Sequence, residues 1–200
     1  MVASWLWDHL LLATGLVGLL ILGLVLALAL GWNSPRPAGS PDWEVQAVPY
    51  RFSAAPDQPY TKLLVPGAGD FAYEVVLRPD VAGETALVEY GLIYRAQDLA
   101  NHYAFLVGVD GYYTVQKVEA GRRTPLVPWQ QFPHIRRGLD RNRLLVACDG
   151  PVCSFRINDE AVVTVDDDQW LSGELGIAAQ SSERHAGVTM LEARAWFRDE

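Results

Sequence analysis

Two cysteines, Cys148 and Cys153, are the residues whose spacing most directly suggests chemistry. They flank Asp149–Val152, in which an Asp-Gly pair stands between apolar runs and favours a tight hairpin. A hairpin would bring the two sulfurs close enough for a disulfide, which persists in oxidising compartments. The alternative is a pair of buried thiols that pack as small hydrophobic side chains. We predict the disulfide, and with it a domain outside the cytoplasm.

Metal ligands are the second chemistry to consider. The acidic run Asp166-Asp167-Asp168 could hold Ca²⁺ through hard oxygen ligands, but it lacks the glycine and the spaced acceptors of a calcium loop. We therefore expect a solvated turn before Trp170 and no metal cofactor. The four histidines show no metal-ligand spacing in the chain: His9, His102, His134 and His185.

A third group of residues favours binding rather than catalysis. Six arginines share one short segment with a single acidic residue, Asp140: Arg122, Arg123, Arg136, Arg137, Arg141 and Arg143. Aromatic side chains lie between them, so the segment is a candidate docking loop for an anionic protein, lipid headgroups or an acidic glycan. The alternative is that the arginines are dispersed over solvated strand edges. The candidate binding residues are Arg95, Tyr113, Trp129, Phe132, His134, Arg136 and Arg137.

The overall charge excludes one class of partner. The chain has 16 basic and 24 acidic residues, a formal net charge of -8. A nucleic-acid-binding surface is basic, because it must neutralise phosphates. We therefore expect no nucleic acid partner.

The elements that must position these residues are β-strands. Runs rich in β-branched and aromatic residues alternate with turn signals, and no long stretch after Leu30 has helical spacing. Many short strands with regular turns predict a sandwich or a barrel. The predicted strands are Phe71–Leu77, Leu87–Arg95, His102–Val109, Tyr112–Val118, Arg143–Cys148, Cys153–Ile157, Ala161–Val165, Glu174–Ala179 and Met190–Phe197.

Pro125–Gly138 is the least strand-like part of the domain. In the strand from His102, the period-two spacing predicts that Tyr103, Phe105 and Val107 point into the core.

The N-terminal part has a different composition. Leu10–Leu30 carries no charged residue and is long enough, at about 1.5 Å per residue, to cross a hydrocarbon core of about 30 Å. Tryptophans flank it on both sides, as at membrane interfaces. The alternative is a signal peptide cleaved after Ala27-Leu28-Ala29. We predict an N-terminal flank at 1–9, a transmembrane helix at 10–32, a proline-rich linker at 33–42 and a β-domain at 43–200.

The run Tyr90–Val109 resembles a pattern of concanavalin A-like jelly rolls: a Gly-Leu-x-Phe-Arg strand, an Asp-x-x-Asn turn and a Tyr-Tyr-x-Phe strand. Phe155–Asp159 and Ser172–Gly176 resemble later elements of the family, in the family's order. The family includes laminin-G-like domains, keto-disaccharide hydrolase-like domains and glucanases. The resemblance implies two antiparallel sheets, one of them concave, with binding on the concave face or the loops around it. The positions that match the first pattern are Gly91, Leu92, Tyr94, Arg95, Asp98, Asn101, Tyr103 and Phe105.

The same resemblance weighs against hydrolysis. A glucanase of this family would carry Glu-x-Asp-x-x-Glu on one strand, and Glu74, Glu84 and Glu89 do not form that motif. We therefore expect no enzyme activity. The expected function is that of a membrane-tethered recognition module or an accessory subunit of a membrane complex. Its partners would be the lipid bilayer, through the N-terminal helix, and another membrane protein or a surface glycan.

The alternative is a cell-surface protein that binds, or less readily processes, carbohydrate. Exposed aromatic side chains such as Tyr113 and Trp129, forming a flat platform on the concave face, would favour this alternative.

Overall fold

The computed structural model describes residues 9, 14–25, 37, 39–45, 49–56, 58–67, 69–80, 88–182 and 185–198. The chain divides into two units, Met1–Ser34 and Pro35–Glu200. In the first unit, residues 14–25 are helical. The remaining residues of the predicted transmembrane segment, 10–13 and 26–32, lie outside the described residues. None of the helices described combines the length and the apolar character that crossing a membrane requires.

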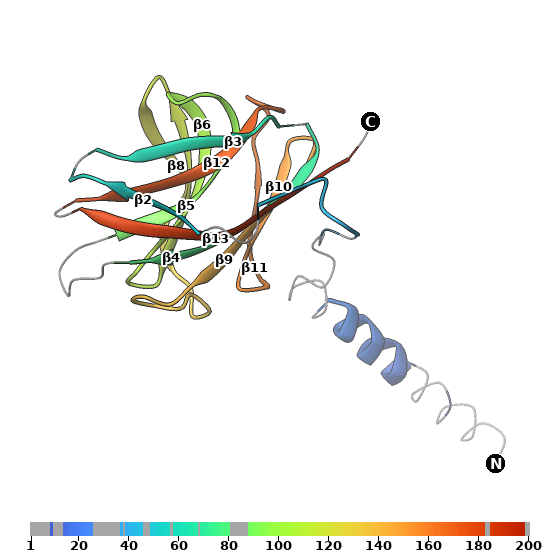
Figure 1. The fold of residues 1–200 in the computed structure, drawn as a ribbon. Coiled ribbons are helices and arrows are strands. Elements are labelled where there is room, and N and C mark those ends of the chain that lie inside the picture. The colour runs from blue at the N-terminus through green and yellow to red at the C-terminus, as the bar shows by residue number, and fades with distance from the viewer. Residues whose placement is uncertain are drawn as a thin grey trace, which may run out of the picture. The chain divides into compact units, whose positions relative to one another are not determined.

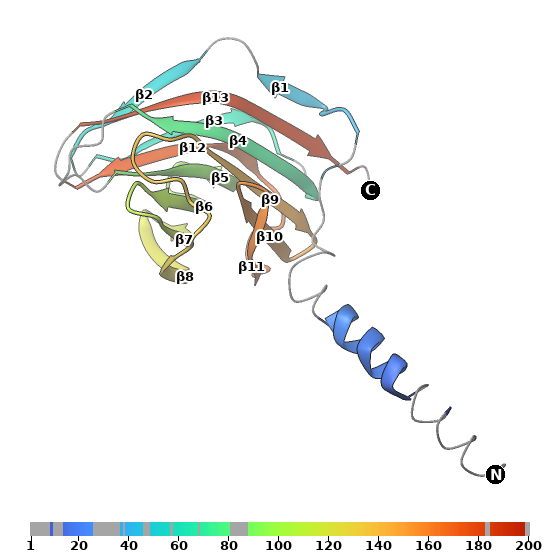
Figure 2. The same ribbon diagram turned by 90° about the horizontal axis from the view of Figure 1, so that it is seen from below.

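The second unit is built of two antiparallel sheets (Figures 1 and 2). One sheet has seven strands in the order β1-β13-β4-β9-β10-β11, with β2 also paired to β13. The other has six strands in the order β3-β12-β5-β6-β7-β8. The predicted all-β sandwich is therefore confirmed. The strands are β1 (Trp43–Val45), β2 (Tyr50–Ala54), β3 (Tyr60–Val65), β4 (Phe71–Pro79), β5 (Val88–Asp98), β6 (Asn101–Gly108), β7 (Tyr112–Glu119), β8 (Arg122–Gln131), β9 (Asn142–Asp149), β10 (Val152–Ile157), β11 (Glu160–Asp166), β12 (Glu174–Ser181) and β13 (Ala186–Phe197).

The core lies between the two sheets and is filled from alternate positions of their strands. Tyr103, Phe105 and Val107 of β6 all belong to it, which confirms the predicted register. Phe105 packs against Phe155 of the opposite sheet, with 4.9 Å between the ring centroids. Strands with one face against a common core need this period-two alternation, and it fixes which side chains face outward.

All nine predicted strands are present, with ends shifted by a few residues. Pro125–Gly138, the least strand-like part of the sequence, is only partly outside the strands: residues 125–131 belong to β8, and residues 132–138 form the loop after it. Pro125 and Pro128 lie within β8, which is the last strand of its sheet and pairs only with β7 among the described strands. Proline removes one N–H donor, and an edge strand tolerates this loss because no second neighbour needs the donor.

The hairpin of β9 and β10 contains the Cys148–Cys153 disulfide that the sequence predicts. Two contacts hold its turn to the rest of the domain. The backbone N–H of Gly150 donates to Asp70 Oδ1 at 2.8 Å. The carbonyl oxygen of Gly150 accepts a hydrogen bond from Nη2 of Arg95. The turn is therefore fixed by a covalent bond within the hairpin and by hydrogen bonds to residues far away in the sequence.

Candidate ligand-binding site on the concave sheet face

The outer face of the six-stranded sheet is unusually well buried. Ile93, Ala104, Leu106 and Ala178 point away from the main core, yet each is no more than 7% exposed. This burial fits a sheet that curves around these side chains, as the bend from β5 to β8 in Figure 2 indicates. The concave face therefore has an apolar floor.

Small residues allow this curvature. Gly91 lies between Ala178 of β12 and Leu106 of β6 in the strand register. A Cβ atom at Gly91 would collide with the carbonyl oxygen of Phe105. Glycine is required where backbones approach this closely, so the Gly-Leu strand of the family pattern has a structural role here.

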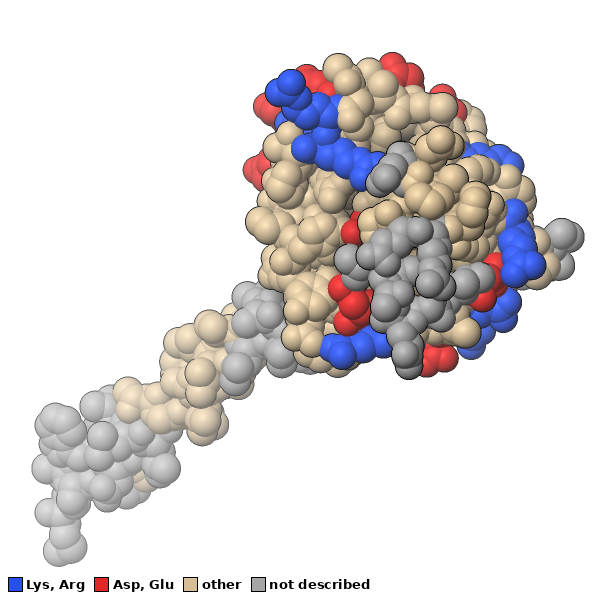
Figure 3. Space-filling view, turned by 90° about the vertical axis from the view of Figure 1, so that its left-hand side faces the viewer, with Lys and Arg blue, Asp and Glu red and all other residues tan. Residues whose placement is uncertain are grey.

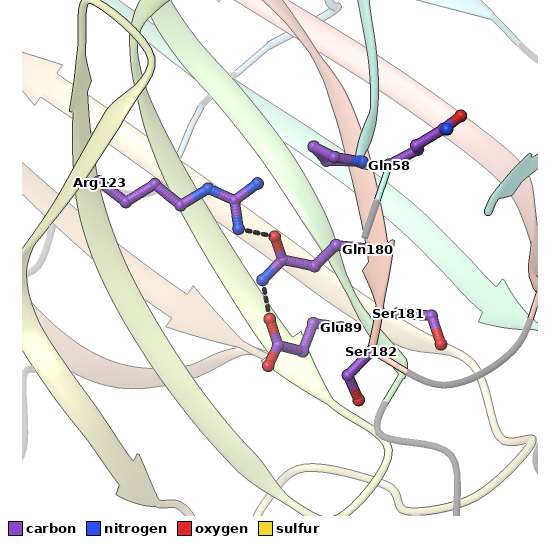
Figure 4. A pocket seen from close by; sticks show the side chains of 7 residues that line it. Gln58, Glu89, Arg123, Gln180, Ser181 and Ser182 are labelled. Carbon is purple, nitrogen blue, oxygen red and sulfur yellow. Dashed lines mark hydrogen bonds between the residues drawn. The ribbon is translucent and has the colours of Figure 1, made fainter. Parts of the chain in front are cut away.

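Three polar side chains come together on the same face of the sheet (Figure 4). Gln180 of β12 stands opposite Glu89 of β5 in the register, and its Nε2 donates to Glu89 Oε2. From β8, Arg123 Nη1 donates to Gln180 Oε1. The amide of Gln180 thus bridges a guanidinium and a carboxylate. We call these three side chains the polar bridge.

The polar bridge borders a pocket of about 330 Å³. Four elements supply its walls: the start of β5, β8, the end of β12, and the residues just before β3. Its lining contains both donors and acceptors, and Glu89 is its one acidic residue among those described. The lining residues are Gln58, Pro59, Glu89, Arg123, Gln180, Ser181 and Ser182.

Burial controls the charge of the titratable groups on this face. Burial raises the pKa of Glu89 to about 7; the charge of Arg123 opposes the shift and that of Asp110 adds to it. Burial likewise lowers the pKa of His102, with Arg123 acting in the same direction. At neutral pH the pocket therefore contains a permanent positive charge and a carboxyl group that is ionised only in part.

Two of the predicted binding residues, Arg95 and Tyr113, do not line this pocket. Arg95 is 1% exposed, and its guanidinium donates to the carbonyl oxygens of Gly69 and Gly150. Tyr113 is 4% exposed and packs against Phe105 and Phe132 in the core. Both side chains are therefore buried within the domain. Because Tyr113 is buried, it cannot form an exposed aromatic platform with Trp129.

The other aromatic candidates lie outside the pocket. Trp129 of β8 is 39% exposed. Phe132 contacts the His134 ring at a centroid distance of 5.2 Å, and the His134 carbonyl oxygen accepts from Asn158 Nδ2 at 2.7 Å. Whether these side chains bind anything stays a prediction.

The arginine-rich segment does not form one surface. Arg123 belongs to the concave pocket, whereas Arg136, Arg141 and Arg143 line a pocket with residues of the seven-stranded sheet. Arg137 lies against Gly111. On the face that Figure 3 shows, basic and acidic side chains are interspersed. Strand β8 separates Arg122 and Arg123 at its start from the arginines that follow its end.

The acidic candidates are also separated. Glu74 lies on β4 of the seven-stranded sheet and Glu89 on β5 of the six-stranded sheet, while Glu84 lies outside the described residues. Asp167 accepts hydrogen bonds from Tyr103 and Lys117, the latter at 2.8 Å. Within the described part of the chain, no three His, Cys, Asp or Glu side chains are grouped for a metal ion.

Gln180, Gln58 and Ser182 are pocket residues that the sequence does not single out. In the sequence, Glu89 stands out only as an acidic strand residue that does not form the glucanase motif Glu-x-Asp-x-x-Glu. The signal that relates Glu89 to Gln180 is the pairing of β5 with β12. These strands are distant in the sequence, so alternation within either strand cannot reveal it.

Comparisons with known proteins identify the fold. No family model and no curated protein matches the sequence. Among solved structures, the carbohydrate binding module CBM66 from Bacillus subtilis has a TM-score of 0.56 at 17% identity, covering 67% of this chain and 81% of that one. The Caenorhabditis elegans galectin LEC-6 has a TM-score of 0.51 at 13% identity, covering 74% and 96%. A functionally unknown protein from Saccharomyces cerevisiae has a TM-score of 0.52 at 12% identity, covering 82% and 96%. The domain is a concanavalin A-like jelly-roll sandwich, which confirms the resemblance.

Proposed function

We propose that this domain is a non-catalytic carbohydrate-binding module and that its concave pocket holds the sugar. The observation that carries the proposal is the polar bridge of Glu89, Gln180 and Arg123, which borders the pocket and lies next to an apolar cluster on the same sheet face. Sugars present closely spaced hydroxyl groups together with apolar C–H faces. The convergent planar polar groups of the pocket complement the hydroxyl groups, and the neighbouring apolar cluster on the same sheet face complements the C–H faces.

The polar bridge leaves hydrogen-bonding capacity for a ligand. A guanidinium has five N–H donors, and Arg123 uses one of them on Gln180. The second carboxyl oxygen of Glu89 remains an acceptor. Two adjacent hydroxyl groups can therefore pair with the Arg123 donors and the Glu89 acceptor at the same time. Ser182, which lies beside Glu89 in the pocket lining (Figure 4), would contact another hydroxyl group.

Two observations support a binding role over hydrolysis. A glycosidase of the usual kind needs two carboxyl groups on either side of the bond it cleaves. Among the described residues that line the pocket, Glu89 is the one carboxyl group. The carbohydrate binding module from Bacillus subtilis, named for binding, shares the fold.

A glycan panel with titration calorimetry tests the proposal. For any glycan of the panel that the wild type binds, Gln180→Ala should weaken binding at least 10-fold, about 1.4 kcal/mol. The matched control is Arg122→Ala, an exposed neighbour of Arg123 on the same strand that does not line the pocket. Equal binding by the Gln180 variant and the wild type would place the sugar elsewhere. Release of reducing sugar from the same panel would show that the domain is an enzyme.

We also propose that the N-terminal segment attaches the domain to a membrane and that the domain lies outside the cytoplasm. The uncharged sequence Leu10–Leu30 supports membrane attachment, and the Cys148–Cys153 disulfide supports a domain outside the cytoplasm. Attachment beside a membrane complex would make the module an accessory subunit of that complex. Cell fractionation with and without residues 1–34 tests the tether: only the full chain should sediment with membranes after a high-salt wash. Recovery of both forms in the soluble fraction would refute it.

A further inference from the structure

The outer face of the seven-stranded sheet has a second polar site. Two pockets of about 240 and 170 Å³ lie side by side there and share Arg143 and Asp159. The arginines that line them come from three strands and one loop, so only the fold brings them together. We call the two pockets the arginine groove, after the arginines that line it: Arg136, Arg141, Arg143, Arg156 and Arg194.

The strand register explains how the groove forms. Glu74 of β4 stands opposite Arg194 of β13 on one side and Leu145 of β9 on the other. Leu145 in turn stands opposite Arg156 of β10. One row across four strands therefore has an arginine at each end and an acidic and an apolar residue between them.

The arginines exceed the acidic residues in the groove. Five arginines line it, against Glu74, Asp159 and Glu192. Neither Arg136 nor Arg141 makes a salt bridge with any described residue, and both are exposed. In a chain of net charge -8, this local positive excess would attract an anion.

Arg143, at the middle of the groove, is only loosely paired. Its Nε lies 3.7 Å from Glu74 Oε1 and its Nη1 lies 3.4 Å from Asp159 Oδ1. The Nε atom is buried and makes no hydrogen bond within the described structure. The side chain as a whole is 40% exposed, so its other nitrogen atoms can donate to an anionic ligand.

One end of the groove is apolar. Trp196 is half-buried and packs beside Ala72, Leu145 and Ala147 on the outer face. Its Nε1 donates to the Gly39 carbonyl oxygen at 3.2 Å, which fixes the orientation of the ring. A fixed indole ring at the end of a charged groove offers a stacking surface for the C–H face of a sugar ring.

We propose that the arginine groove binds an anionic polysaccharide, whose carboxylate or sulfate groups pair with Arg136, Arg141 and Arg143. The acidic residues between the arginines would accept hydrogen bonds from sugar hydroxyl groups. A uniformly anionic lipid surface would instead meet Glu74, Asp159 and Glu192 with repulsion, and it is too flat to enter two pockets. The site is separate from the concave pocket and does not depend on the function proposed for it.

Binding of the full chain to polygalacturonate, dextran sulfate and neutral dextran tests the proposal. Arg136→Ala combined with Arg141→Ala should weaken binding of polygalacturonate or dextran sulfate at least 10-fold, with no binding of dextran by any form. The matched control removes two other exposed arginines, Arg122 and Arg137, and should change the affinity less than 2-fold. The thermal midpoint of each double variant verifies the fold. Gln180→Ala, in the concave pocket, should leave these affinities unchanged.

Three results would overturn the proposal. Equal losses in the two double variants would mean that only net charge matters. Failure of the wild type to bind either anionic polymer would exclude the ligand class. Binding of phosphatidylserine vesicles through Arg136 and Arg141, without binding of the polymers, would assign the groove to lipid.

Discussion

At the scale of single residues, Glu89 has the clearest conflict between burial and charge. Its carboxyl group accepts from Gln180 and lies near Arg123, yet burial raises its pKa to about 7 from an ordinary 4.5. The folded state therefore favours the protonated form. Its contribution to stability is complete below pH 4.5 and is lost as the pH rises through 7.

Glu89→Gln should remove this pH dependence. Between pH 4.5 and pH 8, the wild type should lose roughly 1–2 kcal/mol of unfolding free energy relative to the variant, a figure reduced for the partial exposure of the carboxyl group. Urea denaturation at the two pH values measures the difference. Glu160→Gln, at an exposed position of β11, is the control. Parallel stability curves for the wild type and the Glu89 variant would contradict the prediction.

Arg95 shows why site residues are harder to predict than strands. An arginine after an aromatic strand residue is a reasonable ligand-binding candidate in a sequence. In the fold, Arg95 has a φ angle of 50° and is directed at the carbonyl oxygens of Gly69 and Gly150. Those partners are supplied by distant segments, so neither the spacing nor the composition of β5 can identify them.

At the scale of elements, the hairpin of β9 and β10 carries a short covalent loop. Its cysteines are 5 apart in sequence, so the disulfide constrains few residues of the unfolded chain. Replacing both cysteines by alanine should lower the free energy of unfolding by about 2 kcal/mol. Chemical denaturation of the variant measures this loss, and the wild type in reductant provides an independent comparison. Two freely alkylated thiols in protein isolated without reductant would contradict the disulfide itself.

Strand β6 supplies the central aromatic layer of the core. Phe105 is fully buried and its ring contacts those of Tyr113 and Phe155. Phe105→Ala should lower the free energy of unfolding by about 3–5 kcal/mol, because a large cavity replaces these contacts. The exposed Leu99, in the turn before β6, should tolerate alanine within about 0.5 kcal/mol. A loss below 1 kcal/mol at Phe105 would be incompatible with the strand register.

The strands that could be predicted are those whose two faces differ. Runs such as Phe71–Leu77 alternate between the core and the outer face, and their ends carry turn residues. Strand β8 has one buried residue, Val127, and two prolines, so its pattern resembles a loop. Strand β3 has mostly half-buried positions and also shows no clear alternation. The short strands β1 and β2, which pair only with β13 among the described strands, are also absent from the predicted set. Edge position, which the sequence does not encode locally, accounts for these omissions.

At the scale of the whole molecule, the sandwich presents two separate polar sites. The concave pocket belongs to the six-stranded sheet and the arginine groove to the seven-stranded sheet, with the aromatic core between them. Their lining residues share no member, so binding at the two sites should be additive. Saturation with polygalacturonate should change the affinity of a concave-site glycan less than 2-fold in calorimetry. Competition between the two ligands would show that they share one site.

The prolines of β8 have a further consequence for how these molecules meet one another. The outermost strand of an open sheet exposes backbone groups on which a strand of a neighbouring molecule can continue the hydrogen-bond ladder. Pro125 and Pro128 have no N–H to donate, so β8 has fewer donors than a strand of the same length without proline. The β8 edge is therefore a poorer template for strand addition than such a strand would be.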